Sequence, residues 1–182
     1  MVRSASVRSC KGAPNALSAL STRFAFSASG RTHTSRSFVA RGTPTLEKIT
    51  IKIPGLHPAL EGLRIVQLSD VHIGETLGAK FLEKVVAQVN ALEPDVVALT
   101  GDLVDGSVAR LRPEVAAFGK LKSAHGVFFV TGNHEYYHGA AAWEAEARRL
   151  GFTVLHNEHR VIADGQLIVA GVTDMEGARF SE

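Results

Sequence analysis

The sequence has a single cysteine and no long hydrophobic run, and each of these absences excludes a class of protein. Cys10 has no second cysteine to pair with, so an internal disulfide and a cysteine-based metal cage are both excluded. No segment reaches the roughly 18 consecutive apolar residues that a membrane-spanning helix requires. The 182 residues are 45% hydrophobic, which is typical of a globular protein and excludes disorder throughout the chain.

Acidic residues are absent from residues 1–45, although seven of the 20 Lys and Arg residues lie there. The remaining residues therefore carry 13 basic against 18 acidic side chains, a net charge of −5 behind a formal total of +2. An acidic body does not favour broad electrostatic binding to nucleic acid. We therefore predict an acidic domain at 46–182 behind a basic leader at 1–45.

The composition of the leader leaves several roles open. An Arg- and Ser-rich segment without acids is typical of an organelle transit peptide, and equally of a disordered tail or a stretch translated from a misplaced start. Basic residues in a tail can also bind anionic membrane or nucleic acid. We leave the leader out of the predicted fold.

The domain alternates strand and helix patterns along its length. Short apolar runs predict strands, three- and four-residue apolar spacing predicts helices, and Asp164-Gly165 predicts a hairpin turn. The predicted strands are 46–53 (at a sheet edge), 63–68, 95–100, 127–131, 153–155, 161–163 and 166–170, and the predicted helices are 81–92, one beginning at Pro113, and 140–150. This order predicts an α/β layered domain around a mainly parallel sheet.

Polar side chains follow three of these strands, at the point where each strand ends. Asp70 and His72 follow the first, Asp102 the second, and Asn133 and His134 the third. Because parallel strands deliver their carboxyl ends to one edge of a sheet, these five residues are expected in one crevice. A single Asp at such a place is more often a helix cap, but three polar strand ends together indicate a site.

Carboxylate, amide and imidazole groups are ligands for a divalent cation of intermediate softness, such as Mn, Fe or Zn. Converging carboxylates without a cation would repel one another and raise one another's pKa. A carboxylate that bridges two cations relieves this repulsion, and two cations can clamp both oxygens of an in-line phosphoryl displacement.

The motifs D-x-H, G-D-x-x-D and G-N-H-E resemble those of the calcineurin-like metallophosphoesterase family over residues 63–174. The resemblance implies hydrolysis of a phosphomonoester or phosphodiester by metal-held water, with two divalent metal ions. It also implies that Asp70 and His72 hold the first metal, that Asp102 bridges, and that Asn133 holds the second. A second β-sheet packed on the first is implied as well.

By the same likeness, His134 would protonate the leaving-group oxygen, and Asp105 would orient that imidazole. Tyr136 and His138 lie close enough to G-N-H-E to be candidate substrate-binding residues, and Asp174, which follows an apolar strand, is a third candidate that could line the site. The phrases LRIVQLSDVHIG and HGVFFVTGNHEYYHG look most like the bacterial branch of the family, whose members are often membrane-associated phosphodiesterases. The implied substrate is a phosphorylated small molecule or a lipid head group, at a cytoplasmic or membrane-peripheral location.

The chain lacks the G-H-x-H segment that the family supplies from its C-terminal half. His156 and His159 are better read as turn residues than as replacements. The second metal site would rest on Asp102 and Asn133 alone, and the second sheet would be incomplete, leaving one face of the first uncovered. We therefore expect a truncated phosphoesterase with impaired activity. The alternative is a non-catalytic module or pseudoenzyme that binds metal and phosphate.

Overall fold

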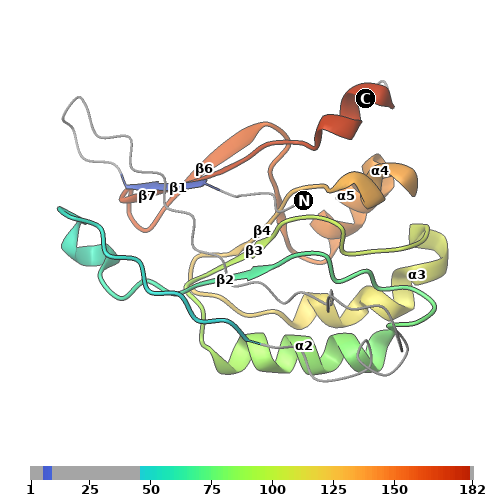
Figure 1. The fold of residues 1–182 in the computed structure, drawn as a ribbon, viewed down its shortest axis with the longest axis horizontal. Helices are drawn as coiled ribbons and strands as arrows, with labels where there is room; N and C mark the ends of the chain where they lie inside the picture. Colours follow the sequence, from blue (N-terminus) through green and yellow to red (C-terminus); the bar gives the residue numbers. More distant parts are fainter. Residues whose placement is uncertain (1–5, 10–45, 181–182) are drawn as a thin grey trace, which may run out of the picture.

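The computed structural model describes residues 6–9 and 46–180, which form three layers (Figure 1). The central layer is a four-stranded parallel sheet in the order β2-β3-β4-β5, and a small antiparallel sheet in the order β1-β7-β6 lies on one side of it. The strands are β1 Ser6–Ser9, β2 Ile65–Leu68, β3 Val96–Leu99, β4 Val127–Phe129, β5 Thr153–Val154, β6 Glu158–Ile162 and β7 Leu167–Gly171. The α/β class and the parallel central sheet are confirmed.

Helices cover the other face of the parallel sheet. The α-helices are α2 Ala79–Ala91, α3 Val108–Val115, α4 Asn133–Tyr137 and α5 Ala140–Arg149, and the 3-10 helices are η1 Pro58–Leu60, η2 Ala116–Lys120 and η3 Met175–Arg179. Because β2, β3, β4 and β5 are neighbours in chain order, their carboxyl ends reach the same edge one after another. That edge holds the candidate site.

The strands of the parallel sheet are buried on both faces, as their apolar runs predict. Leu68, Leu99 and Phe129 face the helices and belong to the larger core. The intervening positions face the small sheet, where Val96 is 0% and Phe128 4% exposed. The expectation of an uncovered sheet face is therefore wrong, because the β6–β7 hairpin places its own apolar residues against these positions.

The predicted start of one helix is wrong. Proline is favoured in a first turn, so Pro113 was expected to begin a helix, but α3 begins at Val108 and contains Pro113. The buried stripe of Val108, Leu111 and Val115 has helical spacing, which extends the helix upstream of the proline. After Val115 the chain tightens into η2.

The predicted edge strand at 46–53 is also wrong. These residues form no regular element, although Ile49, Ile51 and Ile53 retain the expected alternation of partial burial. A strand needs a partner for its backbone groups, and none of the described strands pairs with this segment.

One piece of the leader does belong to the fold. β1 lies at residues 6–9 and pairs antiparallel with β7. The rest of the leader lies outside the described residues, so its predicted role in targeting or as a disordered tail stays a prediction.

Candidate metal centre

The loops after β2 and β3 run side by side beyond the ends of their strands. The N–H groups of Asp70 and His72 donate to the carbonyl oxygens of Gly101 and Asp102 at 3.2 and 3.1 Å. Farther on, Asp105 N donates to the carbonyl of Ile73 at 2.8 Å. This backbone pairing fixes the register between the D-x-H and G-D-x-x-D segments and holds their polar side chains next to one another.

Asp70, His72 and Asp102 form a cluster, with one potential ligand atom from each residue and all three atoms within 4.8 Å of one another. All three residues are half-buried. Their φ angles are 56°, 51° and 55°, in the left-handed region that side-chain-bearing residues rarely adopt. Such strain persists where the surroundings impose it, and it concentrates at functional sites.

Two glycines allow the second and third loops to approach closely. Gly101 has a φ of +83°, and a Cβ built on it would collide with the backbone of Gly132. A Cβ on Gly132 would in turn collide with the carboxylate and the backbone nitrogen of Asp102. Both positions therefore require glycine, and without it Asp102 and the residues after β4 would be pushed apart.

The third loop enters α4, which carries Asn133 and His134 in its first turn. His134 N donates to Asp102 Oδ1 at 3.0 Å, which ties the start of α4 to the cluster. His134 and His72 lie edge to face, with ring centroids 4.4 Å apart. The structure thus brings together side chains from all three predicted strand ends.

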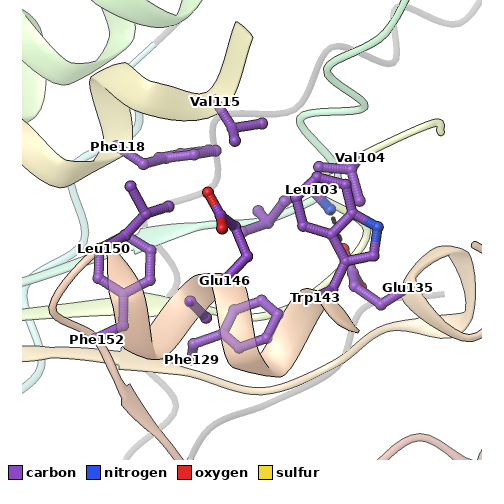
Figure 2. A pocket seen from close by; sticks show the side chains of 11 residues that line it. Leu103, Val104, Val115, Phe118, Phe129, Glu135, Trp143, Glu146, Leu150 and Phe152 are labelled. Atoms are coloured by element: carbon purple, nitrogen blue, oxygen red, sulfur yellow. Dashed lines mark hydrogen bonds between the residues drawn. The ribbon is translucent and has the colours of Figure 1, made fainter. Parts of the chain in front are cut away.

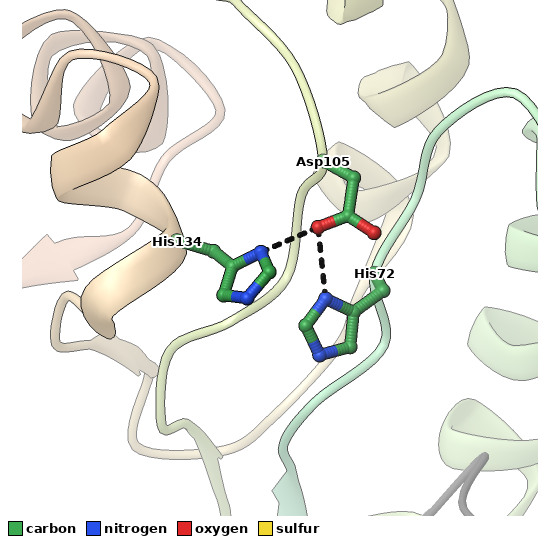
Figure 3. Close-up of side chains that lie close together, drawn as sticks. All are labelled: His72, Asp105 and His134. Atoms are coloured by element: carbon green, nitrogen blue, oxygen red, sulfur yellow. Dashed lines mark hydrogen bonds and ion pairs between the residues drawn. The ribbon is translucent and has the colours of Figure 1, made fainter.

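Asp105 contacts both histidines with one oxygen atom (Figure 3). Its Oδ1 lies 2.9 Å from His72 Nδ1 and 2.6 Å from His134 Nδ1. Partial burial acts to raise the pKa of Asp105, but the hydrogen bonds and charges of the two imidazoles outweigh it and lower the pKa below its ordinary value of 3.8. The family resemblance implied the contact with His134. It did not imply the contact with His72, which depends on the pairing of two loops beyond the strands.

Glu135 holds the loops of the site together, a role that the family resemblance does not imply. Its side chain is almost completely buried and accepts the N–H groups of Gly132, Asp102 and Leu103 at 2.6, 2.9 and 2.8 Å. Burial raises the pKa of Glu135 and the charge of Asp102 adds to this, whereas the three N–H donors act in the opposite direction. The signal available in the sequence was the spacing from Gly132 to Glu135, which is that of a capping box.

The candidate substrate-binding residues lie in different surroundings. Tyr136 is 5% exposed, whereas its neighbour Tyr137 is 51% exposed and lies beside His134. His138 follows α4, with its ring centroid 6.5 Å from that of His134. Asp174 is buried and accepts the N–H of Glu176 at the start of η3. Their roles in substrate binding stay predictions.

A pocket lies behind the site, on the helix side of the sheet (Figure 2). Its lining residues are Leu103, Val104, Val115, Phe118, Phe129, Glu135, Trp143, Glu146, Ala147, Leu150 and Phe152. Most belong to the larger core, so the pocket is a packing gap there. Trp143 Nε1 donates to the carbonyl of Gly106 at 3.1 Å, which anchors the loop that carries Asp105.

The donor set fits a divalent cation of intermediate softness. Two carboxylates and an imidazole converge in one group, and His72, Asp105 and His134 form a second group of similar spread.

Two other histidines lie elsewhere: His156 Nδ1 lies 2.8 Å from Glu144 Oε1 on α5, and His159 is exposed on β6. In the part of the chain that the structure describes, no helix is both long and apolar enough to cross a membrane.

Comparisons with known proteins agree with this geometry. The model of the calcineurin-like phosphoesterase family matches residues 63–178. A transmembrane protein with metallophosphoesterase domain from Danio rerio is 37% identical over 139 residues, and its Bos taurus counterpart is 40% identical over 142 residues. Each match covers 73% of this chain and 32% of the relative.

A bacterial metallophosphoesterase from Aquifex aeolicus is 35% identical over 135 residues, which are 74% of this chain and 51% of that protein. The chain thus spans about a third of the length of the two vertebrate relatives and half that of the bacterial one. No solved structure matches it. Because the family model covers well over half of the chain, and does so over the segment that builds the cluster, the protein belongs to the calcineurin-like phosphoesterase family.

Proposed function

We propose that this protein is a divalent-metal-dependent phosphoester hydrolase whose centre is the edge that carries Asp70, His72 and Asp102. The observation that carries the proposal is the convergence of these three side chains within 4.8 Å, each on left-handed backbone. A fold held together by packing alone has no need for two carboxylates and an imidazole at one sheet edge.

Asp70, His72 and Asp102 would hold the first cation, and Asp102 and Asn133 the second. Bound there, the cations would supply a nucleophilic water near neutral pH and neutralise charge on the phosphate. A hydrogen on His72 Nδ1 that is donated to Asp105 leaves the lone pair on Nε2 for the cation, the usual support of a ligating histidine by a carboxylate.

His134 would donate the proton that the leaving-group oxygen needs. Its Nδ1 faces Asp105 Oδ1 at 2.6 Å, so the ring is held in one orientation and Nε2 is the nitrogen directed away from the carboxylate. Because the pKa of Asp105 is lowered, this side chain is ionised at neutral pH and stabilises the imidazolium form of the acid.

The finer features of the function are proposals from the family resemblance. The substrate would be a phosphomonoester or phosphodiester of a small molecule or a lipid head group, acted on in the cytoplasm or at a membrane surface. Mn, Fe or Zn would serve as the cation. An amide oxygen and a shared carboxylate bind a cation weakly, so the second site would fill only at high metal concentration in this chain.

The experiment measures Mn-dependent hydrolysis of bis(4-nitrophenyl) phosphate. Asp102→Asn is expected to abolish turnover, and His134→Ala to lower kcat on the order of 100-fold or more, as loss of a general acid does. Asp164→Asn is the matched control, because it makes the same chemical change in the β6–β7 turn, and is expected to retain full activity.

A non-catalytic module is the second candidate, and the observation that favours it is that the two candidate ligand groups of the described residues share His72. It predicts about one cation per chain by calorimetry, with phosphate binding and no turnover. Folded protein with that behaviour would reject hydrolysis, and folded protein that binds no cation would reject both functions.

A further inference from the structure

Two exposed aromatic rings contact each other next to His134, the proposed general acid. Tyr137 is the last residue of α4 and is 51% exposed, and Phe180 follows η3 and is 45% exposed. Their ring centroids are 6.0 Å apart with an interplanar angle of 58°. We call this pair the Tyr137–Phe180 shelf. They are two of the six large hydrophobic side chains that are exposed among the described residues.

The shelf is backed by packed structure. Phe180 stacks on the buried ring of Tyr136, with centroids 6.1 Å apart and an interplanar angle of 23°. A Cβ on Gly177 would lie 2.8 Å from the Tyr136 hydroxyl, so η3 and α4 approach too closely there for a larger residue. Phe180 is therefore held against α4, and a surface that is ordered beforehand binds a ligand without the cost of ordering it.

The position of the shelf defines what can contact it. The ring of Tyr137 lies 5.5 Å from that of His134, on the same short helix. If His134 protonates the leaving-group oxygen, that oxygen must lie within hydrogen-bond reach of the imidazole. The carbon atoms attached to the oxygen then extend past His134, and Tyr137 is the exposed ring beside it.

The chemistry of the shelf favours an apolar group. Its rings offer carbon surface, and Arg179, the cation that precedes Phe180, already pairs with Glu176 at 2.9 Å. Ring-to-ring contacts contribute about 1 kcal/mol beyond the burial of apolar area. An anionic group would gain little from such a surface, because the faces of the rings carry partial negative charge.

We infer that the Tyr137–Phe180 shelf is a subsite for an apolar leaving group, so that the preferred substrates are phosphoesters of carbon-rich alcohols or phenols. The inference rests on the proposed function, because it takes the phosphoryl group to lie at the cation cluster. It assigns a substrate-binding role to Tyr137 and Phe180 and leaves Tyr136 as the support beneath them.

The test uses non-hydrolysable phosphonates, so that binding is measured without turnover. Benzylphosphonate carries a ring and ethylphosphonate a methyl group beyond a methylene that replaces the ester oxygen. Calorimetry on the Mn-loaded protein is expected to show benzylphosphonate bound about 5-fold more tightly, as one aromatic contact allows. Tyr137→Ala and Phe180→Ala should each reduce this preference and leave ethylphosphonate binding unchanged, whereas Tyr137→Phe should retain it.

Val161→Ala is the matched control, since Val161 is a similarly exposed apolar residue on β6. Equal binding of the two phosphonates, or a preference that survives Tyr137→Ala, overturns the subsite and leaves the proposed function intact. Equal binding is the result expected if another segment or a second copy of this protein covers the shelf. Failure of both phosphonates to bind in the presence of Mn overturns the proposed function and the subsite with it.

Discussion

Two buried carboxylates line the same core pocket and are stabilised in different ways (Figure 2). Glu146 on α5 accepts charged donors, with Arg149 at 2.6 and 2.9 Å and Arg112 at 3.2 Å. Glu135 on α4 accepts only backbone N–H groups. The side chain of Glu146 is 1% exposed, and Glu135 as a residue is also 1% exposed.

The difference appears in their pKa values. The hydrogen bond from Arg149 and the charges of Arg149 and Arg112 outweigh the effect of burial and lower the pKa of Glu146. Burial dominates at Glu135 and raises its pKa despite three donors. Opposite charge therefore compensates for burial where the carboxylate joins two helices. At Glu135, where the carboxylate holds two loops in register, the three backbone donors do not outweigh the effect of burial.

Glu135→Ala is expected to have the largest effect. It leaves three backbone N–H groups without their acceptor, which costs about 4 kcal/mol in the free energy of unfolding. The loops that carry Asp102 and Asn133 also lose their link, so the affinity for Mn should fall. Urea unfolding and calorimetry measure the two effects.

Glu135→Gln provides the graded comparison, because it keeps one acceptor oxygen, and about half of the destabilisation is expected. A Glu135→Ala protein with unchanged stability and unchanged Mn affinity would show that the loops hold their register without this side chain.

Glu146→Gln should have a smaller effect that is confined to stability. It weakens charge-assisted hydrogen bonds between α5 and α3, with an expected loss of about 2 kcal/mol in urea unfolding. Mn affinity should be unchanged, because the charged partners of Glu146, Arg149 and Arg112, lie on helices and outside the site loops. The control is Glu75→Gln, which breaks the exposed pair with Arg110 and should cost less than about 0.5 kcal/mol. Loss of Mn binding in Glu146→Gln would contradict the separation between the two carboxylates.

The pH dependence of the Glu146→Gln difference should be the smallest effect of the three. The pKa of Glu146 is lowered in the folded protein from its ordinary value of 4.5, so its contribution is complete above about pH 4.5 and is lost as the pH falls through the folded value. The gap in unfolding free energy between wild type and Glu146→Gln should therefore shrink below pH 4.5, as measured by urea unfolding at a series of pH values. A gap that widens on acidification would show that folding raises the pKa of Glu146.

The sequence predicts the parts of this fold whose signals are local. The apolar runs that end at Leu68, Leu99 and Phe129 mark strands buried on both faces, and the spacing within α2 marks a helix. Because the strands are parallel, the polar residues after them must meet at one edge, so the cluster could be anticipated without coordinates.

The remaining features depend on contacts between distant segments. The alternation at 46–53 is a local strand signal, but a strand forms only where a neighbour offers hydrogen bonds. The link from Asp105 to His72 follows from pairing between two loops, and the role of Glu135 follows from three N–H groups on different segments converging on its carboxylate. The spacing from Gly132 to Glu135 indicates only one of these three contacts, the one with Gly132, and the sequence gives no signal for the others or for the link to His72.

The left-handed backbone at Asp70, His72 and Asp102 also restricts the substitutions that this edge can accept. Glycine would relieve the conformation and delete the ligand, whereas valine or isoleucine would meet a steric penalty before any question of metal binding arose. Aspartate, asparagine and histidine are the types that tolerate such angles best. The backbone conformation and the chemistry of metal binding therefore each restrict the residue types at this edge, and only a few types satisfy both requirements.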